Sequence, residues 1–257
     1  MRKENEFERL RVVLVNTRNP LNIGAAARAM SNFGFLHLRV VQPFELAFRE
    51  ARSAVRAAPL LAQAEEFKSL PEAIADCTLV VGTTALSRRD PQHTVRDLRH
   101  GVRLIRKRLA GGRVGLLFGS EKRGLSNEDL SHCHWLMRIP TREQHRSMNL
   151  GQAVAVCLYE LARDVKSAST GEKPALATAG DLERLTWLLV EALQGSGYLR
   201  PDASGARKIR SAAPAEEKIR RLIWRLQLSA ADAELLLGMV RQILWKLARG
   251  STARPGG

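Results

Sequence analysis

The sequence predicts an α/β protein built on a parallel sheet with helices on both faces, followed by a small all-α C-terminal extension. Short apolar runs rich in Val and Leu alternate with stretches of helical pattern through roughly the first two thirds of the chain. Such alternation is typical of a parallel sheet covered by crossover helices. The rest has a helical pattern only. Of 257 residues, 45% are hydrophobic and 26% charged, which suits a packed core and excludes a disordered or collagen-like chain.

Short apolar runs are the candidate buried strands. They are residues 10–17, 36–41, 77–84, 113–120 and 134–140. The helical stretches between and after them are residues 23–33, 45–58, 94–109 and 150–165. Asn22 is expected to cap the first of these helices. Asn149, with Gln152 three residues later, has the pattern of a variant capping box for the last one.

The chain is predicted to divide near residue 165. Residues 1–165 would hold the α/β domain, and residues 166–180, rich in Ser, Thr, Gly, Pro and Lys, would form a linker. Residues 181–257 would form the helical extension, with Asp181 as the N-cap of its first helix. Further helices are expected over residues 215–228 and 229–248, where apolar residues recur at three- and four-residue spacing.

The charge balance indicates a polyanionic partner. Lys and Arg number 41 and Asp and Glu 26, which gives a formal net charge of +15. Basic clusters lie at residues 88–89, 103–108 and 208–221. Each of them could line an RNA groove or be an ordinary solvated face. The excess over the whole chain is the stronger signal, and it favours a nucleic acid.

Several classes of site are disfavoured by the sequence. Three scattered cysteines form neither a disulfide framework nor a Cys-x-x-Cys pair. His132, Cys133 and His134 are adjacent in a strand approach, where neighbouring side chains point to opposite faces, so no metal site is expected. The first ten residues lack an apolar signal region, and no stretch approaches the roughly 18–20 apolar residues of a spanning helix. We therefore expect a cytoplasmic protein with no membrane segment.

Segments that follow strand ends could carry chemistry, because ligands bind at that edge of an open α/β sheet. In residues 16–30, the free N–H groups at a helix start suit a phosphate, and Arg28 lies nearby. On geometry alone, a capped helix with a surface arginine explains this segment better. Residues 116–130 imitate a phosphate-binding Walker loop, but Leu125 and Ser126 follow Gly124 where that motif requires Lys and then Ser or Thr. An NTPase is therefore excluded.

The last such segment is residues 138–161, and serine-hydrolase chemistry has weak support there. Ser147 has no His and carboxylate partner at an interpretable spacing. A dinucleotide fingerprint, Gly-x-Gly-x-x-Gly after a strand, is also missing from the sequence.

Taken together and in this order, the segments resemble a known family. NPLNIGAAAR, FGSEKRGL, and IPT followed by SMNLGQA resemble motifs 1, 2 and 3 of the SPOUT-class, TrmH-like RNA ribose 2′-O-methyltransferases. The resemblance covers about residues 10–165. GYLRPD at residues 197–202 and the later LLLGMVRQI resemble the TrmJ branch, whose members methylate the ribose of the pyrimidine at position 32 of the tRNA anticodon loop.

The resemblance implies a C-terminal trefoil knot in the α/β domain, a homodimer, tRNA as partner and S-adenosylmethionine as cofactor. It also implies which residues form the site. The catalytic group would be Arg28, Asn22, Ser147, Asn149 and Glu121. The cofactor would be bound by Thr83, Thr84, Leu117, Gly119, Glu121, Gly124, Ile139, Pro140, Ser147, Met148 and Asn149.

The chemistry asks little of the protein's side chains. A sulfonium-activated methyl group needs a ribose hydroxyl aligned with it and an oxygen stabilised as it loses its proton. Because a guanidinium is effectively always protonated, we expect Arg28 to act as a phosphate clamp and electrostatic stabiliser rather than as a base. Two alternatives stay open: a ribosomal RNA 2′-O-methyltransferase, and a non-catalytic RNA-binding protein on the same fold.

Overall fold

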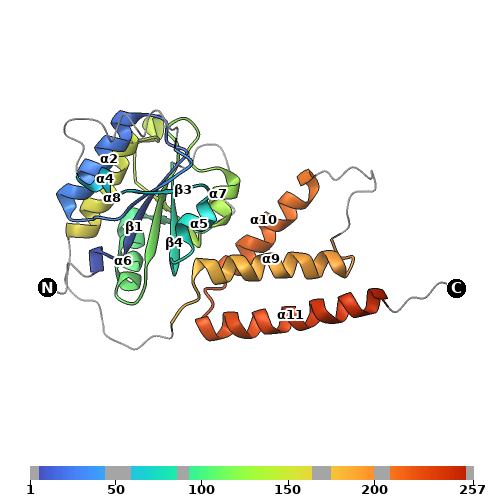
Figure 1. Cartoon of the computed structure of the whole chain (residues 1–257). Helices are drawn as coiled ribbons and strands as arrows, with labels where there is room; N and C mark the ends of the chain where they lie inside the picture. The colour runs from blue at the N-terminus through green and yellow to red at the C-terminus, as the bar shows by residue number, and fades with distance from the viewer. Residues whose placement is uncertain (1–5, 44–58, 86–92, 164–174, 200–208, 253–257) are drawn as a thin grey trace.

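The computed structural model describes residues 6–43, 59–85, 93–163, 175–199 and 209–252 (Figure 1). The helix predicted over residues 45–58 lies outside these ranges, as does most of the predicted linker. A seven-stranded parallel sheet forms the centre of the described α/β part, and helices cover both of its faces. The predicted fold class, with helices following the α/β part, is confirmed.

The sheet has the strand order β3-β2-β1-β6-β4-β7-β5. Its strands are β1 (Leu10–Val15), β2 (Leu38–Val41), β3 (Glu65–Phe67), β4 (Leu79–Thr84), β5 (Val95–Asp97), β6 (Val114–Phe118) and β7 (Trp135–Arg138). The predicted strands are all present and occupy the middle of the sheet. The two edge strands, β3 and β5, were not predicted, because each has three residues and carries charge instead of an apolar run.

Successive residues of each strand feed two separate cores. In β1, Val12 and Leu14 join one core, and Val13 and Val15 join the other. The first core is covered by α2 (Pro20–Phe33), α4 (Pro59–Ala62), α6 (Leu98–Leu109) and α8 (Leu150–Arg163). The second is covered by α5 (Leu70–Ile74) and by helices of the extension. Two short elements, α7 (Asn127–Ser131) and η1 (Glu143–His145), lie in the connections that follow β6 and β7.

Helix starts differ from the predicted caps at two places. The first helix begins at Pro20, and Asn19, not Asn22, is its N-cap, with its side chain accepting from the Leu21 N–H. Proline has a φ angle suited to the first helical position, so the helix begins at Pro20 and its N-cap lies three residues before Asn22. Likewise, Thr178 is the N-cap of α9 (Ala179–Gly195), and Asp181, the third residue of the helix, completes the capping box. The predicted Asn149 cap of α8 is confirmed.

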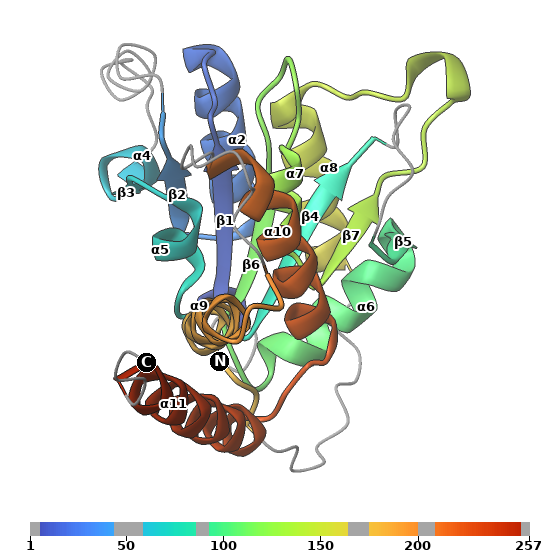
Figure 2. The same cartoon turned by 90° about the vertical axis from the view of Figure 1, so that its right-hand side faces the viewer.

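The remaining helices of the extension are α10 (Ile209–Arg225) and α11 (Ala230–Thr252). Figure 2 shows α10 in front of the sheet and α11 beside α9, on the side away from the sheet. The start of α9 is tied to the α/β part, because the N–H groups of Ala179 and Gly180 donate to the carbonyls of Cys77 and Ala75 at 2.7 and 2.9 Å. The extension therefore shares a core with the sheet.

Trp224 is the central apolar residue of this contact. It is fully buried on α10, and its ring lies edge-on to the rings of His132 and His134, with centroid distances of 5.8 and 5.1 Å. Burial lowers the pKa of His134 to about 4, so the ring is neutral. Its Nδ1 accepts a hydrogen bond from the Val80 N–H at 3.1 Å. These histidines thus serve packing, and the described residues contain no cluster suited to a metal ion.

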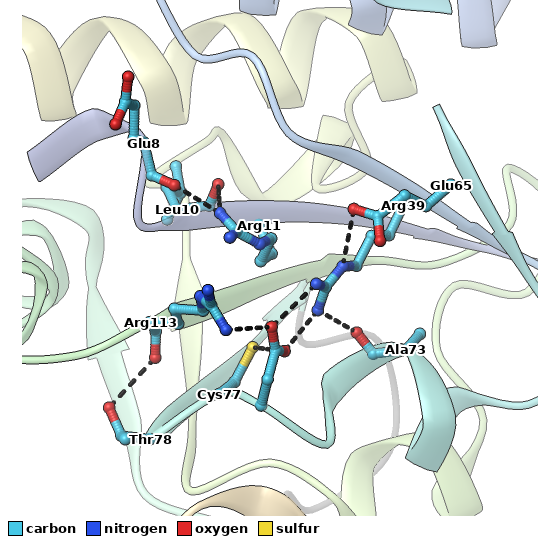
Figure 3. Close-up of polar contacts among 10 residues, drawn as sticks. Glu8, Leu10, Arg11, Arg39, Glu65, Ala73, Cys77, Thr78 and Arg113 are labelled. Carbon is cyan, nitrogen blue, oxygen red and sulfur yellow. Dashed lines mark hydrogen bonds and ion pairs between the residues drawn. The ribbon is translucent and has the colours of Figure 1, made fainter. Parts of the chain in front are cut away.

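An ion-pair cluster with a buried arginine lies at the amino-terminal ends of the strands, near the starts of β1, β4 and β6 (Figure 3). Arg39, whose side chain is 7% exposed, donates through both terminal nitrogens to the Asp76 carboxylate at 2.6 and 2.9 Å. Arg113 adds a third contact at 3.1 Å. Burial by itself would raise the pKa of Asp76, but the hydrogen bonds and charge of Arg39, with help from Arg113, lower it to about 2.

We expect Asp76→Asn to lower the free energy of unfolding by about 3 kcal/mol at pH 7, since the buried Arg39 guanidinium then keeps only the longer, 3.4 Å contact to the half-exposed Glu65 as a counter-charge. The folded-state pKa of Asp76 is depressed, so its stabilisation is complete above the unfolded value near 3.9 and is lost as the pH falls toward 2. Urea unfolding of both proteins between pH 7 and 2.5 measures this.

The matched control is Asp97→Asn. Asp97 is also paired with an arginine, Arg138, but both side chains are exposed, at 60% and 44%. Exposed pairs contribute little, so this variant should stay within about 1 kcal/mol of the parent. An Asp76→Asn variant as stable as the control would contradict the assignment.

Candidate active site

A cavity of about 760 Å³ opens at the carboxyl ends of the central strands. Its walls come from the ends of β4, β6 and β7, the loops that follow them, and the first turns of α2 and α8. Because parallel strands bring their carboxyl ends to one edge, segments more than 100 residues apart meet there. The predicted residues that line this cavity are Asn22, Thr83, Thr84, Gly119, Glu121, Gly124, Ile139, Ser147, Met148 and Asn149.

The loop after β6 closes on itself at two glycines. A Cβ atom at Gly119 would lie 2.1–2.4 Å from backbone atoms of Gly124 and Leu125, so a side chain cannot be accommodated. Gly124 has φ +67°, the left-handed region that favours glycine. Its N–H donates to the Ser120 carbonyl at 2.8 Å. This tight turn directs Glu121 toward the start of α2.

A chain of hydrogen bonds joins the three loops of the site through the side chain of Asn22. Its Nδ2 donates to Glu121 at 2.9 Å, and its Oδ1 accepts from Asn149 Nδ2 at 2.8 Å. Asn149 Oδ1 in turn accepts from the N–H groups of Gly151 and Gln152 at the start of α8, at 2.9 and 3.3 Å. Asn22 is therefore not a helix cap but the link between the segments resembling motifs 1, 2 and 3.

The Glu121 carboxylate also holds the chain entering α2. It accepts from the backbone N–H groups of Arg18 and Asn19 at 3.4 and 3.3 Å. Burial works to raise the pKa of Glu121, but the hydrogen bond from Asn22 and those from the backbone outweigh it and lower the pKa. The carboxylate is thus ionised at neutral pH and lies at the positive end of α2, where a negative charge is favourable.

Three predicted site residues lie elsewhere in this chain. Leu117 is fully buried in the second core, and it reaches the site only through its carbonyl, which accepts from Thr83 Oγ1 at 2.9 Å. Pro140 is exposed and stands between two residues that line the cavity. Arg28 is exposed on α2 and does not line the cavity of its own chain.

The cavity also contains residues that sequence reasoning missed. They are Ala85, His93, Phe118, Ser120, Lys122, Arg123, Leu125, Asn127, Leu130, Leu136, Met137, Thr141, Arg146, Leu150, Ala153 and Arg221. Arg221 belongs to the basic cluster at residues 208–221, whose charge indicated a possible RNA-binding surface but not that one of its members lines the cavity. The others sit in or beside the recognised segments, except for His93, for which no sequence pattern was available.

The cavity has the size and lining of a site for one cofactor-sized molecule. Sites of this kind have volumes of roughly 300–1,000 Å³ and combine apolar walls with a few placed polar groups. Ile139, Met148 and Leu136 supply apolar surface, and Thr83, Ser147 and Asn149 supply polar groups. This composition fits an adenosine-containing methyl donor. Together with the parallel sheet and the strand-end loops, the cavity indicates an α/β enzyme with a site for a small cofactor.

The comparisons with known proteins specify this class. The model of the SpoU rRNA Methylase family matches residues 9–159, and the chain belongs to that family. It is therefore a methyltransferase, and S-adenosylmethionine is its methyl donor. The trefoil knot that the family resemblance implies is consistent with this membership and stays a prediction.

Relatives match nearly the whole chain, including the extension. A tRNA (cytidine/uridine-2′-O-)-methyltransferase TrmJ of Sodalis glossinidius is 33% identical over 240 residues, 91% of each chain. A tRNA (cytidine/uridine/adenosine-2′-O-)-methyltransferase TrmJ of Pseudomonas aeruginosa is 35% identical and covers 95% of this chain and 96% of the relative. The crystal structure of TrmJ from Z. mobilis ZM4 superposes with a TM-score of 0.74 at 30% identity, over 90% of this chain and 97% of that one.

We expect Gly119→Ala to weaken binding of S-adenosylhomocysteine by about tenfold or more, because the added methyl group forces the loop after β6 to open. Calorimetric titration measures this. The control is Gly24→Ala in α2, where a Cβ would meet nothing within 4 Å. That variant should keep its affinity and gain up to about 1 kcal/mol of stability from helix propensity. Unchanged binding by Gly119→Ala would refute the loop's role.

Proposed function

We propose that the protein transfers a methyl group from S-adenosylmethionine to a ribose 2′-hydroxyl of tRNA, at the pyrimidine at position 32 of the anticodon loop. The similarity to the TrmJ relatives, which extends through the helical extension as well as the α/β part, carries this proposal. The net charge of +15 suits a polyanionic substrate. No helix among the described residues is long and apolar enough to cross a membrane. Because the TrmJ relatives act on tRNA, we infer a cytoplasmic enzyme.

We assign the cavity residues to the methyl donor. When bound, S-adenosylmethionine supplies an activated methyl group, so the protein has to bind, orient and exclude water. Thr83, Ser147 and Asn149 would offer hydrogen bonds, and Ile139 and Met148 would hold the adenosine by apolar contact. Asn22 and Glu121 act as positioning residues, because their side chains are occupied in joining the loops.

We infer that Arg28 serves the cavity of a second subunit in a homodimer. Leu21, Ala25 and Arg28 follow one another at four- and three-residue spacing on α2, so they share a stripe of that helix, and each is exposed. Leu21 is 80% exposed, and Tyr159 of the neighbouring α8 is 50% exposed. An apolar face of this kind suits a symmetric contact between two copies. The guanidinium would then bind a phosphate beside the target ribose and stabilise the developing alkoxide.

A ribosomal RNA substrate is the second candidate, because the matching family is named for methylation of ribosomal RNA. Incubation with labelled S-adenosylmethionine and either tRNA or ribosomal RNA, followed by mapping of the modified nucleoside, separates the possibilities. We expect label in tRNA at the 2′-oxygen of nucleotide 32. Label at another tRNA position would overturn the site, label in ribosomal RNA alone would overturn the substrate, and tight RNA binding without transfer would leave a non-catalytic binding protein.

Arg28→Lys should reduce turnover by about 100-fold or more, because an ammonium cannot reproduce the planar, two-pronged contact of a guanidinium. Binding of S-adenosylhomocysteine should be unchanged, because the contact assigned to Arg28 is with the RNA phosphate and the target ribose and not with the methyl donor. Single-turnover methylation and calorimetry measure the two quantities. Near-normal turnover would refute the assigned role.

Mixing two impaired variants, at a concentration of S-adenosylmethionine too low to fill the Gly119→Ala site, tests whether Arg28 acts across the dimer. Arg28→Ala and Gly119→Ala subunits, denatured together and refolded, form mixed dimers with one intact composite site if the arginine serves its partner. About a quarter of the parent activity should return. If the arginine served its own chain, mixed dimers would contain no intact site and activity would stay at the level of the separate variants.

A further inference from the structure

The extension contributes a cationic side chain to the catalytic cavity. Arg221, on α10, lines the cavity together with residues of the α/β part. Its side chain is half-buried, and among the described residues no carboxylate pairs with it. A guanidinium held at an internal surface without a counter-ion is suited to bind an anionic group of a ligand.

His93 lies beside Arg221 in the same wall. The histidine is 7% exposed, and its Nε2 is buried without a hydrogen-bond partner in the described structure. The nearby charges of Arg221 and Arg225 add to burial in lowering the pKa of His93 to about 4, and the ring also bonds to the Leu130 backbone. The ring is therefore neutral, and its free nitrogen is a polar atom directed at no protein group.

The residues on either side of Arg221 hold α10 firmly in place. Arg220 donates to Glu183 of α9 through two bonds of 3.0 Å and to Ser131 Oγ of α7 at 3.2 Å. Trp224 is fully buried against the α/β part. Because these contacts fix the helix, the position of Arg221 in the cavity is a built feature of the fold and not that of a freely moving surface side chain.

The other cations of the cavity differ from Arg221 in exposure. Lys122, Arg123 and Arg146 are exposed on the loops at the mouth, where a phosphate backbone can reach them. Arg221 is instead half-buried, in a part of the lining that also contains buried His93 and the apolar side chains of Leu130 and Leu136. A half-buried position inside the cavity favours a small ligand over a polynucleotide. The methyl donor offers one anionic group, the carboxylate of its amino-acid end.

We propose that Arg221 binds the carboxylate of the methyl donor and that His93 Nε2 accepts a hydrogen bond from the adjacent ammonium group, so that the C-terminal extension forms part of the donor site. This inference rests on the proposed function, because it takes the cavity to be the donor site. It adds that an element outside the methyltransferase family match, which ends at residue 159, completes that site.

The test compares two ligands that differ in the amino-acid end. Calorimetry without RNA measures the affinity of the full-length protein for S-adenosylhomocysteine, which has the carboxylate and ammonium groups, and for 5′-methylthioadenosine, which lacks them. Arg221→Gln should weaken S-adenosylhomocysteine binding by about tenfold and leave 5′-methylthioadenosine binding unchanged. Arg221→Lys, which keeps the charge, should lose less. His93→Phe should also weaken only the first ligand.

Arg225→Gln is the matched control, because it removes one positive charge from the same helix at an exposed residue that does not line the cavity. It should bind both ligands like the parent. Equal weakening of both ligands by Arg221→Gln would mean a general distortion and would overturn the proposal. Unchanged donor affinity with a raised KM for tRNA would assign Arg221 to RNA instead, which also overturns it. A parent protein that binds neither ligand would refute the donor site itself, a separate outcome.

Discussion

The site depends on one amide, the side chain of Asn22. The amide nitrogen of Asn22 must face Glu121, because a carboxylate can only accept a hydrogen bond. Its amide oxygen must face Asn149, because Asn149 presents its Nδ2 donor. The resulting series of hydrogen bonds runs from the positive end of α8 to a negative carboxylate, so each dipole is aligned with the next and strengthens it. Segments 99 and 127 residues away from Asn22 are held in one arrangement by this side chain.

Close backbone approach makes that arrangement possible. The glycine at 119 lets the loop after β6 fold onto itself, and the glycine at 151 lets α8 contact α2, where a Cβ would come within 2.6 Å of the Ala25 Cβ. Both close contacts exist only because glycine has no side chain. The polar chain through Asn22 then selects one geometry among those that the glycines permit. The cavity depends on the same hydrogen bonds, because they hold the loops that line it in fixed positions.

The centre of the sheet could be predicted from the sequence, because buried parallel strands are continuous apolar runs. Strands β3 and β5 were missed because each has only three residues, some of them charged, and so contains no apolar run. The sequence identified Asn22 and Glu121 as site residues through a resemblance. Their actual partners could not be predicted, since no local pattern reveals a contact across 99 residues. The role of Arg28 is equally out of reach of the sequence, because its side chain is exposed and does not line the cavity of its own chain.

The extension shows how a helical pattern can hide a contribution to the cavity. Lys208 to Arg221 is an ordinary basic run in the sequence, yet neighbouring positions on α10 face different surroundings. Arg220 is neutralised by Glu183 and Glu216, Trp224 fills the core, and Arg221 alone of these three lines the cavity. A helix docked this firmly cannot leave the α/β part without exposing Trp224 and the Arg220 charge. The cavity and the extension are therefore one structural unit, and any contact that α10 makes with RNA would act directly on a wall of the cavity.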